Sequence, residues 1–440
     1  MSFNSLLFLI FFLPSFYLLF VLTPKKYRKY PLLLASLLFY SLSGIHNLII
    51  LIGISIVNYV GTRWATRKEK SHILLNGLAL WNLLTLFFYK YSNNYAFPLG
   101  ISFYTFNNIM YIIDIRRNKQ KVEKKFFNYL TYITSFIHIS MGPLIKYKEY
   151  EERMTSLSPT IEEFEKGYTR FIEGLIKKVL LADNLGLLLL SVKNIEYISV
   201  LSCVSIPILY ALELYIDFSS YTDMAIGLGK TVGITYPENF NKPYLATSVS
   251  DFWRRWHMTL TNFIKEYVYI PLGGNRVSKG KHIRNVLIVW ILTGIWHGNT
   301  INYMIWGLYY GILLMIEKTF LSKKIDKFPN FIKHLYVMSI VIIGNIFFSM
   351  TSISEIASYF NHLFTEELIN TNILFLIKEN IVLLIASVII CINIPEWIEE
   401  KMKKKRIWNY IKPVFLMILL ILTISYLVSG SYLPFLYNAF

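Results

Sequence analysis

One histidine, His297, lies in a stretch of chain that carries no charge to pair with it. From Asn285 to Ile316 there is no Asp, Glu, Lys or Arg. Burial disfavours the imidazolium form, so a histidine in such a stretch stays neutral near pH 7 and can accept a proton. A general base that activates a hydroxyl for attack on an acyl carbon has this requirement. The alternative is a histidine that hydrogen-bonds a neighbouring carbonyl and packs a helix junction.

A second histidine, His257, lies in the segment SVSDFWRRWHMTLTNFIKEYVYIPLGGNR, residues 248–276. Ser248 and Asp251 fit a capping box, which predicts that one helix begins here, and Pro271 with the glycines after it predicts its end. Apolar side chains recur along this helix at helical spacing, and His257 is expected to point with them. These apolar residues are Phe252, Trp253, Trp256, Leu260, Phe263, Ile264 and Tyr267. His257 is either structural or a second member of a catalytic site.

Two acidic residues, Asp217 and Asp223, lie at the end of a predicted span in LYIDFSSYTDMAIGLGK, residues 214–230. They either cap a helix or pair with a basic residue, or else they orient a catalytic histidine or line a polar substrate path. The chain lacks metal-ligand spacing, a P-loop and a G-x-S-x-G motif, and Cys203 and Cys391 both lie in apolar runs. We therefore expect no metal site and no bound cofactor.

The elements that must position these residues are membrane helices. The chain is 55% hydrophobic and 16% charged, with a mean hydropathy of +0.45, whereas soluble domains carry about a quarter charged residues. Long apolar runs, such as residues 3–23 and 380–394, recur along it, and we count roughly ten to twelve candidate spans. The prediction is an all-α polytopic membrane protein that forms a single domain over residues 1–440.

Basic residues account for the net charge of +17. On a soluble protein this charge would suggest nucleic acid, but here the basic residues occupy short loops between apolar runs. That pattern places the loops in the cytoplasm, predicts an outside N-terminus, and gives no reason to expect a nucleic-acid partner. The loops are residues 24–30, 63–70, 116–125 and 400–406.

Two polar segments, residues 146–180 and 230–284, interrupt the spans and are expected to be cytoplasmic or interfacial. The first predicts an amphipathic helix. The charge-free run 285–316 is too long for one span, since a helix of this length measures about 48 Å against a hydrocarbon core of about 30 Å. A turn at residues 298–302 would give two shortened helices that meet inside the membrane near His297. The alternative is a full second span over residues 300–320.

The motifs around these residues resemble the membrane-bound O-acyltransferase superfamily, and most of all its bacterial branch of alginate, polysaccharide and peptidoglycan O-acetyltransferases. The resemblance rests on residues 250–276 (SDFWRRWHMTLTNFIKEYVYIPLGGNR) and 292–298 (LTGIWHG). Four further stretches support it: PLGISFYTF (98–106), GLIKKVLLAD (174–183), YIDFSSYTDMAIGLG (215–229) and YPENFNKPY (236–244). The motif-bearing core covers residues 98–320.

This resemblance implies a ring of about eleven spans around a thinned centre, with re-entrant and cytoplasmic interfacial helices. It implies a membrane O-acyltransferase that uses His297 as general base, with His257 in support. The co-substrate would be acetyl-CoA or another acyl thioester from the cytoplasm, and the acceptor an extracytoplasmic polysaccharide or cell-wall polymer. Candidate substrate-binding residues in or beside the motifs are Trp296, Trp256, Arg255, Asp217, Asn241 and Tyr104.

The same resemblance implies a multi-pass protein of the bacterial plasma membrane that works with an extracytoplasmic partner resembling an acetyltransferase or esterase. Within the superfamily, D-alanyl transfer from a carrier protein to teichoic acid is the alternative. A polysaccharide exporter is the alternative from another class. An exporter predicts intramembrane acidic residues for ion coupling and internal repeats, and the sequence shows neither.

Overall fold

The structure is a computed structural model that describes residues 1–68, 71–92, 95–155, 157–325, 327–430 and 434–436. The described chain divides into two compact units that alternate along the sequence. The first unit comprises Met1–Leu175 and Tyr221–Glu238, and the second comprises Ile176–Ser220 and Asn239–Leu436. The sequence predicts a single domain over the whole chain, and this stays a prediction.

The regular structure described is helical, which confirms the all-α polytopic prediction. Six described helices are long and apolar enough to cross a membrane. They are α3 (Ile45–Ala65), α4 (Ser71–Tyr91), α10 (Val200–Thr231), α14 with the π-turn after it (Ile301–Leu321), α16 (Asn330–Ser349) and α21 (Trp408–Val428). A bent pair, α18 (Thr371–Glu379) and α19 (Ile381–Cys391), makes a seventh if its 65° break is counted within one span. The count of about eleven and the ring around a thinned centre stay predictions.

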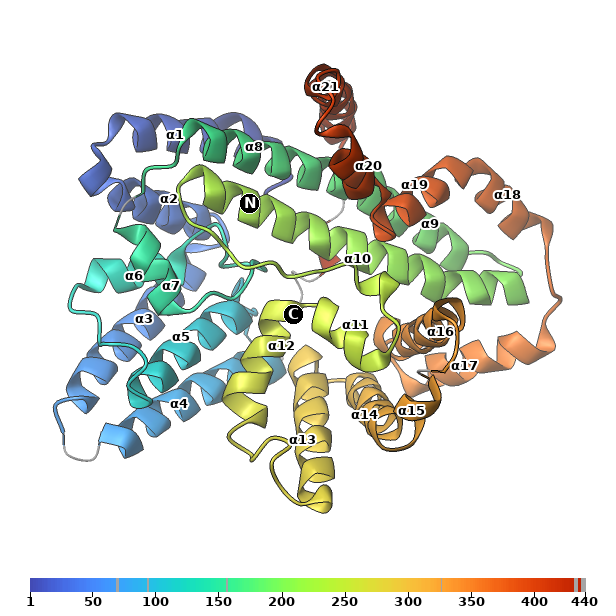
Figure 1. Ribbon diagram of the computed structural model, residues 1–440, viewed down its shortest axis with the longest axis horizontal. Helices are drawn as coiled ribbons and strands as arrows, with labels where there is room; N and C mark the ends of the chain where they lie inside the picture. Colours follow the sequence, from blue (N-terminus) through green and yellow to red (C-terminus); the bar gives the residue numbers. More distant parts are fainter. Residues whose placement is uncertain (69–70, 93–94, 156, 326, 431–433, 437–440) are drawn as a thin grey trace. The chain divides into compact units, whose positions relative to one another are not determined.

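The first unit packs its apolar helices around aromatic side chains. Its other helices are α1 (Leu13–Leu22, preceded by a π-helical turn over Leu7–Phe12), α2 (Lys29–Ser41), α5 (Ile101–Arg116), α6 (Phe126–Thr134), α7 (Tyr147–Met154) and α8 (Ile161–Ile176, whose last residue falls in the second unit). Phe12 and Phe136 meet edge to face with ring centroids 5.3 Å apart. Helix α5 runs beside α4 and is buried along nearly all of its length (Figure 1).

Helix α8 is the amphipathic helix predicted for the polar segment 146–180. It begins with a reciprocal cap in which the backbone N–H of Glu163 donates to Thr160 Oγ1 and the N–H of Thr160 donates to Glu163 Oε2. Phe171 and Leu175 on its apolar face are buried, while Ile161 is 89% exposed. The apolar side chains of its first turns are therefore exposed, and the predicted interfacial location of this helix stays a prediction.

The second unit carries the helices that bear both candidate histidines. Its shorter helices are α9 (Asp183–Lys193), α11 (Val249–Arg255), α12 (Met258–Ile264), α13 (Lys279–His297), α15 (Ser322–Ile325), α17 (Ile353–Thr365) and α20 (Ile394–Met402), with π-turns over Lys177–Ala182 and Lys265–Tyr269. The part of α10 up to Ser220 also belongs to this unit.

Helices α13 and α14 (Ile301–Ile316) form an antiparallel pair, hereafter the hairpin, joined by residues 298–300. Glycines allow the backbones to approach closely. A Cβ on Gly294 would lie 2.3 Å from the carbonyl oxygen of Tyr303, and a Cβ on Gly307 would lie 2.3 Å from that of Trp290. The predicted break near His297 is confirmed, since α13 ends at this residue. With its π-turn, α14 is also long enough to cross a membrane, so the predicted second span over 300–320 fits as well.

The single helix predicted for the segment around His257 is wrong, because the chain breaks at this residue. Helix α11 ends at Arg255 and α12 begins at Met258. His257 adopts a left-handed backbone with φ 43° and ψ 53°, which no α-helix contains. The predicted cap is present, since Ser248 Oγ accepts the backbone N–H of Asp251.

Candidate active site

His297 is the last residue of α13 and is enclosed by aromatic rings. Its side chain is only 5% exposed. The ring of Trp306 from α14 and the ring of Phe348 from α16 each meet the imidazole edge to face, with centroids 4.9 Å away. The ring of Tyr303 lies 6.1 Å away, with its plane inclined by 30° to the imidazole. The imidazole is therefore held in a nearly dry site with a fixed orientation.

This environment suits a base that becomes charged during reaction. The carbonyl end of α13 carries partial negative charge, which stabilises a cation at the last residue of the helix. Aromatic rings attract a cation over their faces. These surroundings would therefore stabilise a positive charge on the imidazole of His297.

His257 is fixed by the chain that precedes α11. Its Nδ1 lies 3.1 Å from Oδ1 of Asn239, and its ring meets Phe218 of α10 edge to face at 4.8 Å. The side chain is 3% exposed. Two further hydrogen bonds join the same loop to α12. The backbone N–H of Met258 donates to the carbonyl oxygen of Asn239, and the backbone N–H of Thr259 donates to Asn239 Oδ1. The break at His257 is thus stabilised by a residue eighteen positions earlier.

Aromatic contacts join the two histidine environments. Trp253 of α11 packs against Trp306, whose ring contacts His297. On the α10 side, Phe218 contacts His257, while Tyr210 contacts Phe348, a ring that also touches His297. Tyr210 and Phe218 are eight residues apart on α10, or about 12 Å along the helix axis. The two predicted catalytic residues therefore lie in the same unit, on elements that aromatic side chains connect.

Four of the predicted substrate-binding residues lie next to the histidines in the chain or in the loop before α11. Trp256 is buried against Phe240, with ring centroids 5.1 Å apart, and Trp296 is buried beside His297. Arg255 donates to Asp251 Oδ2 at 2.9 Å, and its carbonyl oxygen accepts the N–H of Asn241. These contacts place the four residues and leave their binding roles as predictions.

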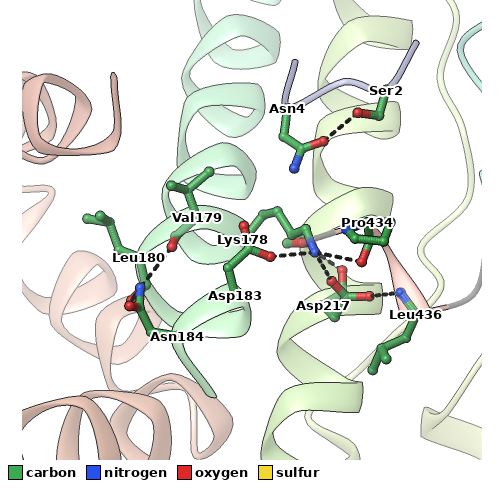
Figure 2. A network of polar contacts seen from close by, with 11 residues as sticks. Ser2, Asn4, Lys178, Val179, Leu180, Asp183, Asn184, Asp217, Pro434 and Leu436 are labelled. Carbon is green, nitrogen blue, oxygen red and sulfur yellow. Dashed lines mark hydrogen bonds and ion pairs between the residues drawn. The ribbon is translucent and has the colours of Figure 1, made fainter. Parts of the chain in front are cut away.

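Asp217, a fifth predicted substrate-binding residue, lies in a buried ion-pair network (Figure 2). Lys178 Nζ lies 2.6 Å from Asp217 Oδ1 and 2.7 Å from Asp183 Oδ1. The other oxygen of Asp217 accepts the backbone N–H of Leu436, and Lys178 Nζ lies over the ring of Phe435. Asp217 therefore pairs with a basic residue, which is one of the alternatives predicted from the sequence.

The remaining predicted residues lie in the first unit. Tyr104 is fully buried in α5. Asp223 accepts two hydrogen bonds from the guanidinium of Arg170, which also binds Glu238 through both of its carboxylate oxygens. Asp223 thus also pairs with a basic residue, as one of the alternatives predicted from the sequence has it.

Two residues that position the site were not predicted. Asn239 holds His257, although the YPENFNKPY stretch had directed attention to Asn241 instead. Glu317, 4% exposed, accepts the backbone N–H groups of Val249 and Ser250 and so anchors the start of α11. One sequence signal could have pointed to Glu317: it is the first charged residue after the charge-free run 285–316.

Comparison with known proteins identifies the family of this chain. Residues 78–360 match the family model described as MBOAT, membrane-bound O-acyltransferase family, a range that contains both histidines. The chain is 33% identical over 374 residues to the probable alginate O-acetylase AlgI of Pseudomonas aeruginosa, which covers 79% of this chain and 72% of that protein. It is 30% identical over 406 residues to the peptidoglycan O-acetyltransferase of Helicobacter pylori, covering 79% and 76%. The teichoic acid D-alanyltransferase of Bacillus subtilis is 29% identical over 228 residues, covering 49% and 58%.

Proposed function

Because this chain belongs to the membrane-bound O-acyltransferase family and is a multi-pass O-acyltransferase, we propose that it transfers acetyl groups for O-acetylation of an extracytoplasmic polysaccharide or cell-wall polymer. His297 is the general base and His257 supports it. The observation that carries this proposal is the position of His297, a buried imidazole at the carbonyl end of α13 within a ring of aromatic side chains.

The proposed reaction exchanges a thioester for an oxygen ester. A hydroxyl gives its proton to the imidazole of His297 while its oxygen bonds to the carbonyl carbon of the thioester. The carbon–sulfur bond then breaks, and the departing thiolate takes the proton from the imidazolium. Charge develops on both the thioester oxygen and the imidazole, so a dry site with fixed groups lowers the barrier more than water would.

Acetyl is the acyl group we infer. The alginate and peptidoglycan relatives, whose names specify acetyl transfer, match 79% of the chain, whereas the D-alanyltransferase of Bacillus subtilis matches 49%. The donor is acetyl-CoA or another acyl thioester from the cytoplasm. We also propose that the chain lies in a bacterial plasma membrane with its N-terminus outside, and that an extracytoplasmic partner protein helps to place the acetyl group on the polymer.

One assay separates acetyl from D-alanyl transfer. Mild base releases both ester-linked acetate and D-alanine from cell-wall and secreted polymers, and both can be quantified in cells with and without the gene. Loss of acetate without the gene supports the proposal. Unchanged acetate with loss of D-alanine would replace it by the alternative acyl group.

His297→Ala and His297→Gln test the catalytic role in the same cells. We expect each variant to lower ester-linked acetate by at least about 100-fold, the contribution of a positioned general base. His46→Ala is the matched control because His46 is exposed. Fluorescence-detected size-exclusion chromatography checks that every variant is inserted and folded. Normal acetate in the well-folded glutamine variant would refute His297 as the base.

A further inference from the structure

The segment before α11 presents one amide side chain to the buried imidazole of His257. Asn239 is 1% exposed, and its Oδ1 lies 3.1 Å from His257 Nδ1, 3.2 Å from the backbone nitrogen of Thr259 and 2.9 Å from Thr259 Oγ1. Three groups able to donate a proton therefore converge on one atom. The arrangement determines where the proton of the imidazole sits.

The identity of that amide atom follows from its neighbours. The backbone N–H of Thr259 can only donate, so the atom that faces it must be the oxygen of the Asn239 amide and not the nitrogen. An amide oxygen can only accept. The His257 nitrogen beside it must therefore carry a hydrogen, because two lone pairs at 3.1 Å would repel each other. In a neutral imidazole the lone pair is then on Nε2.

We propose that Asn239 is a positioning residue that holds His257 in the Nδ1–H tautomer, so that Nε2 carries the lone pair through which the imidazole would accept a proton during acyl transfer. This inference rests on the proposed function, in which His257 supports His297. It gives the second histidine a defined reactive atom. The edge-to-face contact with Phe218 fixes the ring plane, and the bond to Asn239 fixes its rotation within that plane.

A purely structural role for Asn239 predicts different results. Its backbone carbonyl and its side chain accept the N–H groups of Met258 and Thr259, so it also caps the start of α12. Loss of a side-chain cap lowers helix stability without changing the tautomer of a histidine. The decisive readouts are therefore the protonation of His257 and the division of any kinetic effect between kcat and KM.

The first experiment is NMR on the full chain in lipid nanodiscs, labelled with ¹⁵N only in its eight histidines. His257→Asn identifies the His257 signals by their loss. In the wild type at neutral pH we expect a protonated Nδ1 and an unprotonated Nε2 at His257. In Asn239→Ala we expect a mixture of both tautomers. A protonated Nε2 in the wild type would overturn the proposal.

The second experiment measures acetyl transfer from acetyl-CoA to isolated polymer with the same preparations. Asn239→Ala should lower kcat by about 10- to 100-fold while KM changes by less than about twofold, because orientation of the base is lost and binding is retained. Asn239→Asp keeps an oxygen acceptor and should recover most of kcat. Asn370→Ala is the matched control: Asn370 caps α18 through its side chain in the same way, by accepting the N–H of Ile373.

The outcomes separate this proposal from the proposed function. If Asn239→Ala keeps wild-type kcat, or loses no more activity than Asn370→Ala, then Asn239 is only a cap and the proposal is wrong. Equal losses in Asn239→Ala and Asn239→Asp also contradict it. If the wild type transfers no acetyl group, the proposed function fails, yet the NMR spectra still decide whether Asn239 sets the tautomer.

Discussion

Trp253 packs edge to face against Trp306, with ring centroids 5.7 Å apart and the ring planes at 81°. Trp253 lies on the helix that leads into His257, and Trp306 touches the imidazole of His297. The same indole of Trp253 also meets Trp290 and Tyr310, so it fits against both helices of the hairpin. One side chain therefore fixes the distance between the two elements that carry the candidate catalytic groups.

Trp253→Ala should uncouple these elements. We expect a loss of stability on the order of 3 kcal/mol from the lost aromatic packing, and a fall in acetyl transfer of about 100-fold in the molecules that remain folded, because small displacements of catalytic groups are costly. Trp253→Phe should retain much of both. Thermal unfolding in detergent and polymer acetylation measure the two effects. Trp397→Ala, which removes an exposed indole on α20, is the control, and an equal effect there would contradict this role.

Gly294→Ala should open the hairpin. Its new Cβ would lie 2.3 Å from the backbone oxygen of Tyr303, so α13 and α14 must move apart and His297 must move with them. We expect a loss of stability of about 1–3 kcal/mol and a strong loss of activity. Gly280→Ala is the matched control on the same helix, because a Cβ there meets no atom within 4 Å. If the two variants behave alike, close approach at Gly294 does not position the site.

Glu123 should make the first unit sensitive to acid. Burial raises the pKa of Glu123, but hydrogen bonds from the Tyr147 hydroxyl, the backbone N–H of Lys125 and the Asn128 amide outweigh burial and hold this pKa below its ordinary value. A carboxyl with a lowered folded-state pKa stabilises the protein above its unfolded pKa of about 4.3, and the contribution disappears as the pH falls through the folded value.

Glu123→Gln tests the direction of this pH dependence of stability. At pH 7 the variant should be less stable than the wild type by about 1 kcal/mol, since an amide cannot accept all of these hydrogen bonds. The difference should shrink below about pH 4, where the wild-type carboxyl becomes protonated. Thermal unfolding across this pH range measures it, with Glu149→Gln on α7 as a comparison. A difference in stability between wild type and variant that grows as the pH falls would show that the folded-state pKa of Glu123 is not lowered.

The position of His297 could be predicted from the sequence because charge and length constrain it. A run of 32 residues without a charge exceeds one span, and glycine and asparagine after His297 offer a turn. The break at His257 could not be predicted in this way. Apolar residues continue at helical spacing from Phe252 to Tyr267, and the contact that stabilises the break comes from Asn239 in a different loop. Local pattern reports which face of a helix is apolar, whereas a tertiary contact decides where the helix is interrupted.

The backbone at His257 limits which mutations of this protein can be interpreted. Asparagine, aspartate and histidine enter the left-handed region several-fold more often than other residues, whereas a β-branched side chain is a true outlier there. Alanine scanning at this position would thus mix a backbone penalty of about 1 kcal/mol with any chemical effect. Asparagine retains the turn without the imidazole, so it is the informative replacement. By the same reasoning, random mutagenesis at residue 257 should yield few side chains that the fold tolerates. The backbone conformation therefore restricts which residues can replace His257 during evolution, independently of any catalytic requirement.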